Sequence, residues 1–222
     1  GAMGFHRNLS MGEILAQVLL LSKECGRPSN IVYMGMGEPF LNYDATMHSL
    51  ETLQDNRCYG FGARRITVST AGIVPEVYRF AQEGGQVNLA VSLHATTDTK
   101  RGELMPIARL YTLRQLLDAA WYYTEHTGRR ISFEYVLIPG VNDSHHDADR
   151  LVEMLKDKLA HLNLIPFNPV PKGNYKRPGR KNFDRFLKYL KQHGVNVTPR
   201  RSAGTSVHAA CGQLAGSLEN PA

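Results

Sequence analysis

Apolar residues recur along the chain in five short runs, and nearly every run is followed by a longer stretch with helical periodicity. The runs are rich in β-branched residues and are apolar throughout, which is typical of strands buried on both faces. Strands of this kind that alternate with amphipathic helices predict an α/β fold with a parallel sheet, either doubly wound or a complete or partial (β/α) barrel. The predicted strands are Asn30 to Met36, Arg65 to Thr70, Val87 to His94, Ile131 to Ile138 and His161 to Phe167.

The helical stretches carry recognisable start and stop signals. A Ser or Thr followed three residues later by Glu or Gln predicts a capping box, and a glycine after the last apolar position predicts a helix end. The capping-box signal occurs at Ser10 with Glu13 and at Thr112 with Gln115, and the stop signal at Gly128 and Gly194. Ser144 is predicted to cap a helix that ends near Leu159.

The composition is that of an ordinary globular protein. With 222 residues, 42% hydrophobic and 21% charged, the chain can bury one substantial core, so we expect a single domain over residues 1–222. No apolar run is long enough to span a bilayer and no leader pattern is present, which predicts a cytoplasmic protein without membrane contact. The wide spacing of Cys25, Cys58 and Cys211 suits a reducing compartment and does not resemble a disulfide framework.

Positive charge is concentrated in one segment. Residues 172–201 hold ten Lys or Arg and one acid, Asp184, for a net charge of +9, although the whole chain carries only +6. This pattern predicts either a surface that binds RNA phosphates, with Tyr175, Phe183 and Tyr189 available for stacking, or simply a solvated helix face. The candidate RNA-binding residues are Lys172, Lys176, Arg177, Arg180, Lys181, Arg200 and Arg201.

Polar residues gather where the predicted strands end, which is where parallel α/β folds bind ligands. Carboxylate, hydroxyl, imidazole and amide groups suit a zwitterionic small molecule better than a metal, and no His or Cys pair has zinc-ligand spacing. A serine at a strand end is more often a helix cap, and a lone histidine more often a structural hydrogen-bond partner. The strand ends are Gly37-Glu38-Pro39, Ser69-Thr70, Ser92-Leu93-His94, Pro139-Gly140 and Asn168-Pro169.

The first of these ends is not a dinucleotide fingerprint. Gly35 and Gly37 lack the third glycine and the immediate helix that receives phosphate, and Glu38 with Pro39 would place a negative charge and a rigid turn there. A bare backbone next to a carboxylate suits the ammonium group of an amino-acid-like ligand.

Taken together, several motifs resemble one family. The segments GFHRNLS, MGMGEPFLNYD, RRITVSTAG, NLAVSLHA, LMPI, FEYVLIPGVNDS, NLIPFNPVP and AACGQL are similar to the radical S-adenosylmethionine RNA methyltransferases of the RlmN/Cfr type, in the family's order over almost the whole chain. The resemblance implies a partial (β/α)6 TIM-like barrel. It also implies methylation of adenine: at C2 in 23S rRNA (peptidyl transferase centre) and in tRNA for the RlmN branch, or at C8 of rRNA, with antibiotic resistance, for the Cfr branch. We favour the first branch as the commoner type.

The resemblance also assigns residues. Gly37 and Glu38, then Ser69, then Ser92, Leu93 and His94, and finally Asn168 match the family's contacts to S-adenosylmethionine. Cys211 matches the cysteine that becomes S-methylated and carries the methyl to adenine. A thiolate accepts a methyl from a sulfonium readily, whereas the adenine carbons are poor nucleophiles, so the route needs such a carrier.

One family feature is not found in this sequence. The family holds a [4Fe-4S] cluster through a Cys-x3-Cys-x2-Cys motif upstream of the segment that aligns with Gly4. We therefore expect no metal ligand in this chain and no catalytic activity of this chain alone. We also expect five of the family's six barrel strands, because the first strand lies upstream with the motif. The resemblance implies an electron donor such as flavodoxin for the full enzyme. Loss of a strand would expose a sheet edge, through which we expect association.

Two other functions are compatible with parts of the sequence. A non-catalytic RNA-binding module would use the basic segment and ignore Cys211. A different radical enzyme on the same barrel would act on a small molecule and have no RNA affinity.

Overall fold

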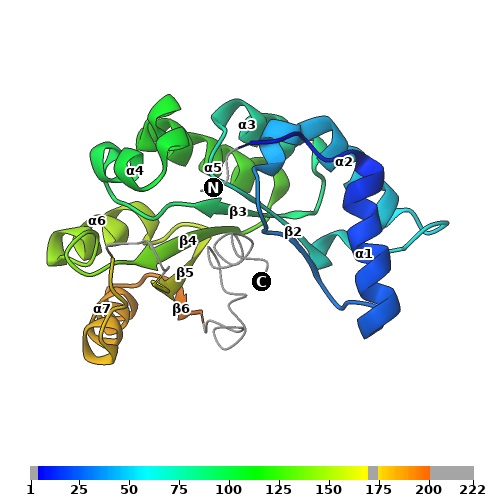
Figure 1. Ribbon diagram of the computed structural model, residues 1–222. Helices are drawn as coiled ribbons and strands as arrows, with labels where there is room; N and C mark the ends of the chain where they lie inside the picture. The colour runs from blue at the N-terminus through cyan, green and yellow to red at the C-terminus, as the bar shows by residue number, and fades with distance from the viewer. Residues whose placement is uncertain (1–4, 170–174, 201–222) are drawn as a thin grey trace.

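The computed structural model describes residues 5–169 and 175–200, which form one six-stranded parallel sheet (Figure 1). Its strands follow the chain in the order β1-β2-β3-β4-β5-β6, each in register with the next. The strands are β1 (Ile31–Tyr33), β2 (Ile66–Thr70), β3 (Asn88–Ser92), β4 (Ile131–Leu137), β5 (Ala160–Pro166) and β6 (Val197–Pro199).

The strand order decides between the two predicted architectures. A doubly wound sheet reverses its order at a switch point, whereas here each strand lies beside its predecessor without reversal. Because parallel crossovers are right-handed, an unreversed order places the crossover helices on one face of the sheet, as Figure 1 shows. The partial barrel is therefore confirmed, and in the described residues β1 and β6 are not paired with each other.

The expectation of five strands was wrong by one. β6 is three residues long, two of which are exposed, so it has too few apolar positions to stand out in the sequence. Pairing with β5, with Leu162 opposite Val197, makes it a strand. At the other edge, β1 stops at Tyr33, earlier than predicted, before the chain turns at Gly35 to Gly37.

The helix signals are largely confirmed. Capping boxes start α1, α5 and α6 at Ser10, Thr112 and Ser144, and Gly128 ends α5 in the left-handed conformation. α6 ends at Leu155 rather than near Leu159, because Lys156 leaves the helical conformation. The helices are α1 (Met11–Cys25), η1 (Pro39–Asn42), α2 (Tyr43–Gln54), η2 (Ala63–Arg65), α3 (Val74–Glu83), α4 (Asp98–Leu104), η3 (Pro106–Leu110), α5 (Leu113–Thr127), α6 (His145–Leu155) and α7 (Arg180–Gln192), with Gly194 following α7 at positive φ.

The two faces of the sheet differ in chemistry. In β2, Ile66 and Val68 are fully buried against the helices, whereas Thr67 and Ser69 point to the opposite, concave face and are half-buried. β5 repeats this pattern with buried Leu162 and Leu164, and with half-buried Asn163 between them. The helix-covered face thus holds the core, and the concave face is a polar surface on which a ligand can lie.

Apolar side chains are exposed at the β1 edge of the fold. Val32 in β1, Met36 after it, and Leu19 to Leu21 in α1 are all exposed. α1 packs against α2 and contains no buried residue. Within the described residues, no helix is long and apolar enough to cross a membrane.

Candidate functional site at the carboxyl ends of the strands

The predicted cofactor residues lie at the carboxyl ends of four strands. Glu38 follows β1, Ser69 is the last residue but one of β2, Ser92 ends β3 and Asn168 follows β5. Because neighbouring strands are parallel and in register, their carboxyl ends lie side by side at the same end of the sheet. The structure therefore brings the predicted residues together at the carboxyl-terminal end of the partial barrel, as the sequence motifs indicated.

Glu38 connects the ends of β1 and β2. Its Oε1 accepts a hydrogen bond from the backbone N–H of Phe40 at 3.1 Å, which caps η1, and its Oε2 accepts from the backbone N–H of Ala71 at 2.6 Å. Burial raises the pKa of Glu38, an effect that the hydrogen bonds from Ala71, Thr70 and Phe40 only partly offset. A half-buried carboxylate with no cationic partner in the described residues is one that a ligand cation would stabilise.

The backbone before Glu38 is open. Gly37 has a φ of +96°, which side-chain-bearing residues rarely adopt, and a Cβ at Gly35 or Gly37 would meet no atom within 4 Å. The peptide groups of this turn are thus exposed to a ligand rather than covered by the protein.

The two serines contribute hydroxyl groups without a structural duty. Ser69 and Ser92 are half-buried on the concave side of the sheet, and neither hydroxyl has a hydrogen-bond partner in the described part of the chain. Neither caps a helix, which was the main alternative for such serines; Thr97 caps α4 instead. Leu93 differs, because its side chain is fully buried in the core and only its backbone can contact a ligand.

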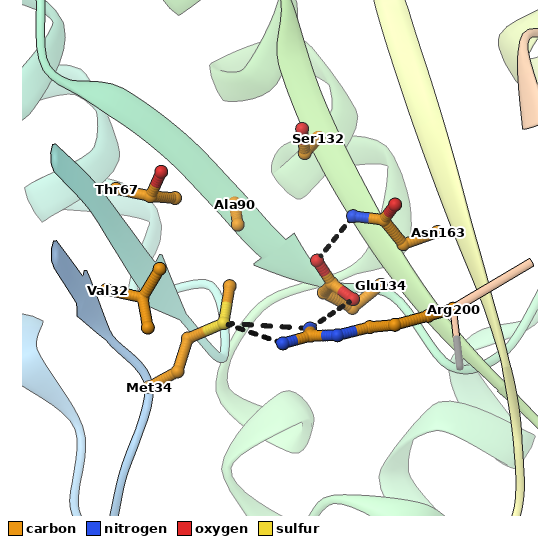
Figure 2. Close-up of a pocket in the computed structure, with 8 residues that line it drawn as sticks. All are labelled: Val32, Met34, Thr67, Ala90, Ser132, Glu134, Asn163 and Arg200. Atoms are coloured by element: carbon orange, nitrogen blue, oxygen red, sulfur yellow. Dashed lines mark hydrogen bonds and ion pairs between the residues drawn. The ribbon is translucent and has the colours of Figure 1, made fainter. Parts of the chain in front are cut away.

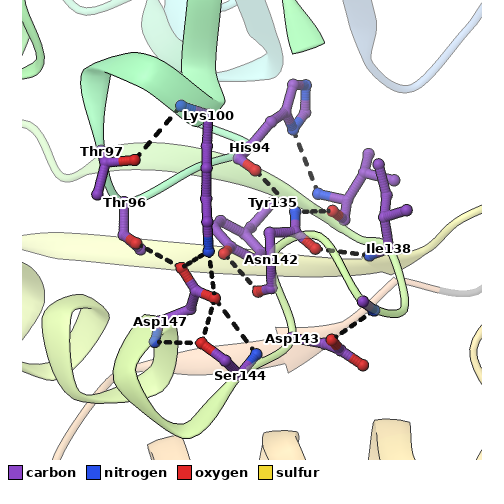
Figure 3. A network of polar contacts seen from close by, with 12 residues as sticks. His94, Thr96, Thr97, Lys100, Tyr135, Ile138, Asn142, Asp143, Ser144 and Asp147 are labelled. Atoms are coloured by element: carbon purple, nitrogen blue, oxygen red, sulfur yellow. Dashed lines mark hydrogen bonds and ion pairs between the residues drawn. The ribbon is translucent and has the colours of Figure 1, made fainter. Parts of the chain in front are cut away.

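His94 is held in an unusual backbone conformation with a defined ring state. Its φ is +55°, and its Nδ1 accepts a hydrogen bond from the backbone N–H of Val136 at 3.2 Å (Figure 3). Burial, and secondly the charge of Arg101, lower the pKa of His94 to about 4, so the ring is neutral near pH 7. Since Nδ1 is the acceptor, the ring proton lies on Nε2, which can donate to a ligand.

Asn142 supports this conformation. It is completely buried; its Nδ2 donates to the carbonyl oxygens of His94 and Val136, both at 2.7 Å, and its Oδ1 accepts from the N–H of Ile138 at 2.7 Å. Figure 3 shows the amide side chain at the centre of these bonds, between the ends of β3 and β4.

The segment after His94 is anchored on α6. The buried carboxylate of Asp147 accepts hydrogen bonds from Thr96 at 2.7 Å and from Lys100 at 2.9 Å (Figure 3). Burial alone would raise the pKa of Asp147, but hydrogen bonds from Ser144, Lys100 and Thr96 together lower it. These bonds fix the α4 end of the loop between β3 and α4, and the bond from Asn142 to His94 fixes its β3 end.

Arg101 is a site residue that the sequence analysis missed. It is 1% exposed, and its Nη2 donates to the carbonyl of Ala71 at 2.5 Å and to that of Ser92 at 3.1 Å, so it links the ends of β2 and β3. Its Nε and Nη1 are buried without a hydrogen-bond partner in the described residues. Burial lowers the pKa of Arg101 to about 10. A positive charge thus lies directly beneath the predicted ligand contacts, and no local pattern announces it.

The concave face holds a pocket of about 220 Å³ that contains a charged pair. Glu134, 5% exposed, accepts a hydrogen bond from Asn163 at 2.8 Å and forms an ion pair with Arg200 at 3.3 Å (Figure 2). The Arg200 guanidinium also reaches Met34, which follows β1 (Figure 2). One of the predicted RNA-binding cations therefore lies inside the half-barrel, paired with a buried carboxylate.

The other basic residues divide into two groups. Arg177 donates to the Oδ1 of Asn168 at 3.0 Å, which places it beside a predicted cofactor contact. Lys176, Arg180 and Lys181 are exposed, and Arg180 forms a 3.7 Å ion pair with Asp184 on the same helix. Lys172, Arg201 and Cys211 lie outside the described residues.

The aromatic residues among these cations are mostly used in packing. Tyr189 donates to Asp149 at 2.5 Å and stacks on His193, and Phe183 packs against the core. Tyr175, which contacts the ring of Phe167 edge-on, is 42% exposed. Of the three aromatics predicted to stack on bases, Tyr175 is the one with an accessible ring.

The described residues contain no group of three or more His, Cys, Asp or Glu that could hold a metal ion. Cys25 and Cys58 are free and exposed, Cys25 at the end of α1 and Cys58 in the turn after α2. A cluster does not fit these residues, whereas the unpaired hydroxyls, the neutral imidazole and the Glu38 carboxylate fit a zwitterion.

Known proteins share this sequence and fold. Residues 1–155 match the model of the Radical SAM superfamily. The chain is 50% identical over 215 residues to a probable dual-specificity RNA methyltransferase RlmN of Geobacillus thermodenitrificans, covering 95% of this chain and 59% of the relative, and 47% identical to that of Clostridium novyi, covering 95% and 62%. A crystal structure of a radical SAM methyltransferase from Sphaerobacter thermophilus has a TM-score of 0.92 and 49% identity, covering 96% of this chain and 64% of that one.

This chain spans about 60% of the length of the curated relatives it matches. The superfamily uses S-adenosylmethionine together with a [4Fe-4S] cluster, and its match covers well over half of the present sequence. The chain belongs to the radical SAM superfamily.

Proposed function

We propose that this chain is the core of an RNA methyltransferase that binds S-adenosylmethionine at the carboxyl ends of β1 to β5 and methylates C2 of adenine in 23S rRNA and tRNA. The observation that carries the proposal is that Glu38, which has no cationic partner among residues 5–169 and 175–200, lies at the same end of the sheet as the hydroxyls of Ser69 and Ser92, which have no hydrogen-bond partner in those residues. The relatives named as RlmN, at about 50% identity, support the RNA methyltransferase class.

Both charged groups of the cofactor's amino-acid end would have a complementary group in the site. Glu38 would accept hydrogen bonds from the ammonium group, which offsets the cost of burying its charge. The hydroxyl of Ser92 and the Nε2–H of His94 would donate to the carboxylate. The open turn at Gly35 and Gly37 would let the ligand approach the backbone closely.

Buried charge supports the same orientation. Arg101 lies beneath the ends of β2 and β3 with two buried nitrogens unpaired in the described residues, so it contributes positive potential on the side where we place the carboxylate. Glu38 lies at the carboxyl end of β1, on the other side of the proposed ligand site. A zwitterion would thus be oriented by opposite charges at its two ends.

The methyl group and the radical chemistry of the family are supplied by S-adenosylmethionine and a [4Fe-4S] cluster. The described residues provide no ligands for the cluster, and we derive no step through it. Cys211, outside the described residues, is the proposed methyl carrier: its thiolate would receive a methyl group that the poorly nucleophilic adenine carbon cannot take directly.

RNA would approach along α7. Arg180 and Lys181 on α7, and Lys176 just before it, are exposed and can neutralise backbone phosphates, whereas Arg200 is paired with Glu134. We place the protein in the cytoplasm with 23S rRNA and tRNA as substrates and an electron donor such as flavodoxin as partner.

The product tests the proposal. RNA from cells that lack 2-methyladenosine is digested and analysed by mass spectrometry after expression of a protein that contains this chain, with Cys211→Ala as the control. We expect 2-methyladenosine in rRNA and tRNA with the unaltered chain and none with the variant. Formation of 8-methyladenosine would assign the Cfr-type reaction, and unmethylated RNA from a protein that binds both cofactors would contradict the proposal.

A further inference from the structure

A second pocket, of about 540 Å³, opens at the opposite ends of the strands. It lies where β2, β3 and β4 begin, and Thr67, Asn88 and Ser132 form its wall. Arg129 and Arg130, in the turn between α5 and β4, complete it. Its volume is within the range of small-molecule sites.

The pocket is strongly positive. No carboxylate is among its lining residues, and neither Arg129 nor Arg130 forms an ion pair in the described part of the chain. η2 adds Arg64 and Arg65, also without ion pairs there, immediately before β2. The carbonyl oxygen of Arg64 accepts a hydrogen bond from Asn88 at 2.8 Å, which places η2 beside the pocket.

The polar groups of the pocket are oriented in advance. Arg129 donates to the Oδ1 of Asn88, and the amide nitrogen of Asn88 donates to the carbonyls of Arg64 and Ile66, so this side chain cannot rotate without losing bonds. The Nε of Arg129 is buried with no partner in the described residues. Thr67 and Ser132 add hydroxyls that have no hydrogen-bond partner there.

We propose that this pocket binds a phosphate group, held by Arg129 and Arg130 and by the hydroxyls of Thr67 and Ser132. Guanidinium groups with spare donors bind phosphate oxygens through strong, charge-assisted hydrogen bonds. No carboxylate lines this pocket, and Glu134, two residues beyond Ser132 on β4, is paired with Arg200 instead. A metal would need acidic ligands, and an apolar ligand would leave these donors unpaired. The phosphate belongs to an RNA backbone or to a free phosphorylated molecule. This site goes beyond the proposed function, which concerns the carboxyl ends of the strands.

Two probes distinguish the sources: inorganic pyrophosphate, titrated by calorimetry, and a short single-stranded RNA, titrated by fluorescence anisotropy at several salt concentrations. The test variant is Arg130→Gln, because this exposed side chain has no structural partner among the described residues. Arg129→Gln is the second variant. The matched control is Arg114→Gln on α5, an exposed arginine whose Nε lies 3.9 Å from the carboxylate of Asp118. Thermal unfolding of each variant checks that the fold is kept.

We expect Arg130→Gln to weaken binding of at least one probe about tenfold, with unchanged thermal unfolding and no effect of Arg114→Gln. A loss confined to RNA, with a salt dependence shallower by about one phosphate contact, assigns the site to an RNA backbone. A loss confined to pyrophosphate assigns it to a free phosphorylated ligand. Equal affinities of Arg130→Gln, Arg129→Gln and Arg114→Gln for both probes would overturn the proposal.

Discussion

The side-chain amide of Asn142 donates a 2.7 Å hydrogen bond to the carbonyl oxygen of His94, joining the loop after β4 to a residue that β3 leaves in a left-handed conformation. A positive φ is sterically unfavourable for a residue with a side chain, and this hydrogen bond helps to hold His94 in that conformation. The position of the imidazole therefore depends on a buried residue outside the proposed ligand contacts.

Replacement of Asn142 by alanine should destabilise the protein and weaken the site together. The carbonyls of His94 and Val136 and the N–H of Ile138 would be left unpaired in the interior, and we expect a loss of about 2–4 kcal/mol in the free energy of unfolding. Urea unfolding measures this loss, with Asn182→Ala on the exposed face of α7 as the control. A loss no larger than that of the control would contradict the role of Asn142.

The affinity for S-adenosylmethionine should depend on pH through Glu38. Burial raises its pKa, so the carboxyl group becomes protonated at a higher pH than an ordinary glutamic acid, with its pKa of about 4.3. Only the ionised form attracts an ammonium group; affinity should therefore fall as the pH is lowered through the pKa of Glu38.

Glu38→Gln is the control for this titration. Its affinity should be lower than that of the wild type near neutral pH and should lack the part of the pH dependence that Glu38 causes. Protonation of His94, with a pKa of about 4, would remain in both proteins. Parallel pH profiles for the two proteins would show that Glu38 does not face the ligand's cation.

The stability effect of Glu38 has the opposite sign. An acid whose pKa is raised by folding stabilises the fold most when protonated, below its unfolded pKa, and this contribution is lost as the pH rises through the folded pKa. The difference in unfolding free energy between Glu38→Gln and the wild type, measured without ligand, should therefore shift in favour of the variant as the pH rises through the pKa of Glu38. Urea unfolding at a series of pH values tests the sign.

Arg101→Met should affect ligand binding more than stability. The substitution removes two hydrogen bonds to carbonyls but also the cost of burying a cation, so we expect the free energy of unfolding to change by less than about 2 kcal/mol. Affinity for S-adenosylmethionine should fall at least about tenfold, because the ends of β2 and β3 lose their shared donor.

A second readout separates charge from packing at this position. Since the charge of Arg101 helps to lower the pKa of His94, that pKa should rise in Arg101→Met, as measured by NMR titration. Arg109→Met, which removes a hydrogen bond to Gly102 in the same region, should leave it unchanged. An unchanged His94 pKa together with unchanged affinity in Arg101→Met would remove Arg101 from the site.

Arg200 and Arg180 should have different roles although both belong to the basic segment. Arg200→Ala leaves the buried carboxylate of Glu134 without its cation and should cost about 1–3 kcal/mol of unfolding free energy. Arg180→Ala, at an exposed position, should leave stability unchanged and reduce RNA affinity. Equal stabilities of the two variants would contradict the importance of the Glu134–Arg200 pair.

Local sequence patterns predicted the parts of the fold that depend on neighbouring residues. The capping boxes at Ser10 and Thr112 involve residues three positions apart, and both form as expected. β6 was not predicted because its strand character comes from pairing with β5 rather than from its own composition. The end of α6 was placed four residues late, because the turn after Leu155 interrupts an apolar pattern that runs on.

In the candidate site, too, the sequence predicted the residues that local patterns mark and missed those that act through distant contacts. Glu38, Ser92 and His94 could be proposed as ligand contacts because they lie at or shortly after the ends of apolar strands, and strand ends are where such folds bind ligands. Arg101 and Asn142 act on residues that are distant in the chain, so no spacing reveals them. Glu134 carried an available signal that we did not use: an acid within an apolar strand must have a partner in the interior.

The most direct test of the central claim is a calorimetric titration of the 222-residue chain with S-adenosylmethionine, beside Glu38→Gln. We predict saturable binding at one site and a loss of about tenfold or more in the variant, because a charge-assisted contact to the ammonium group is removed. Binding of equal strength in both proteins, or no binding to a wild-type chain that unfolds cooperatively, would contradict the assignment of the strand ends as the cofactor site.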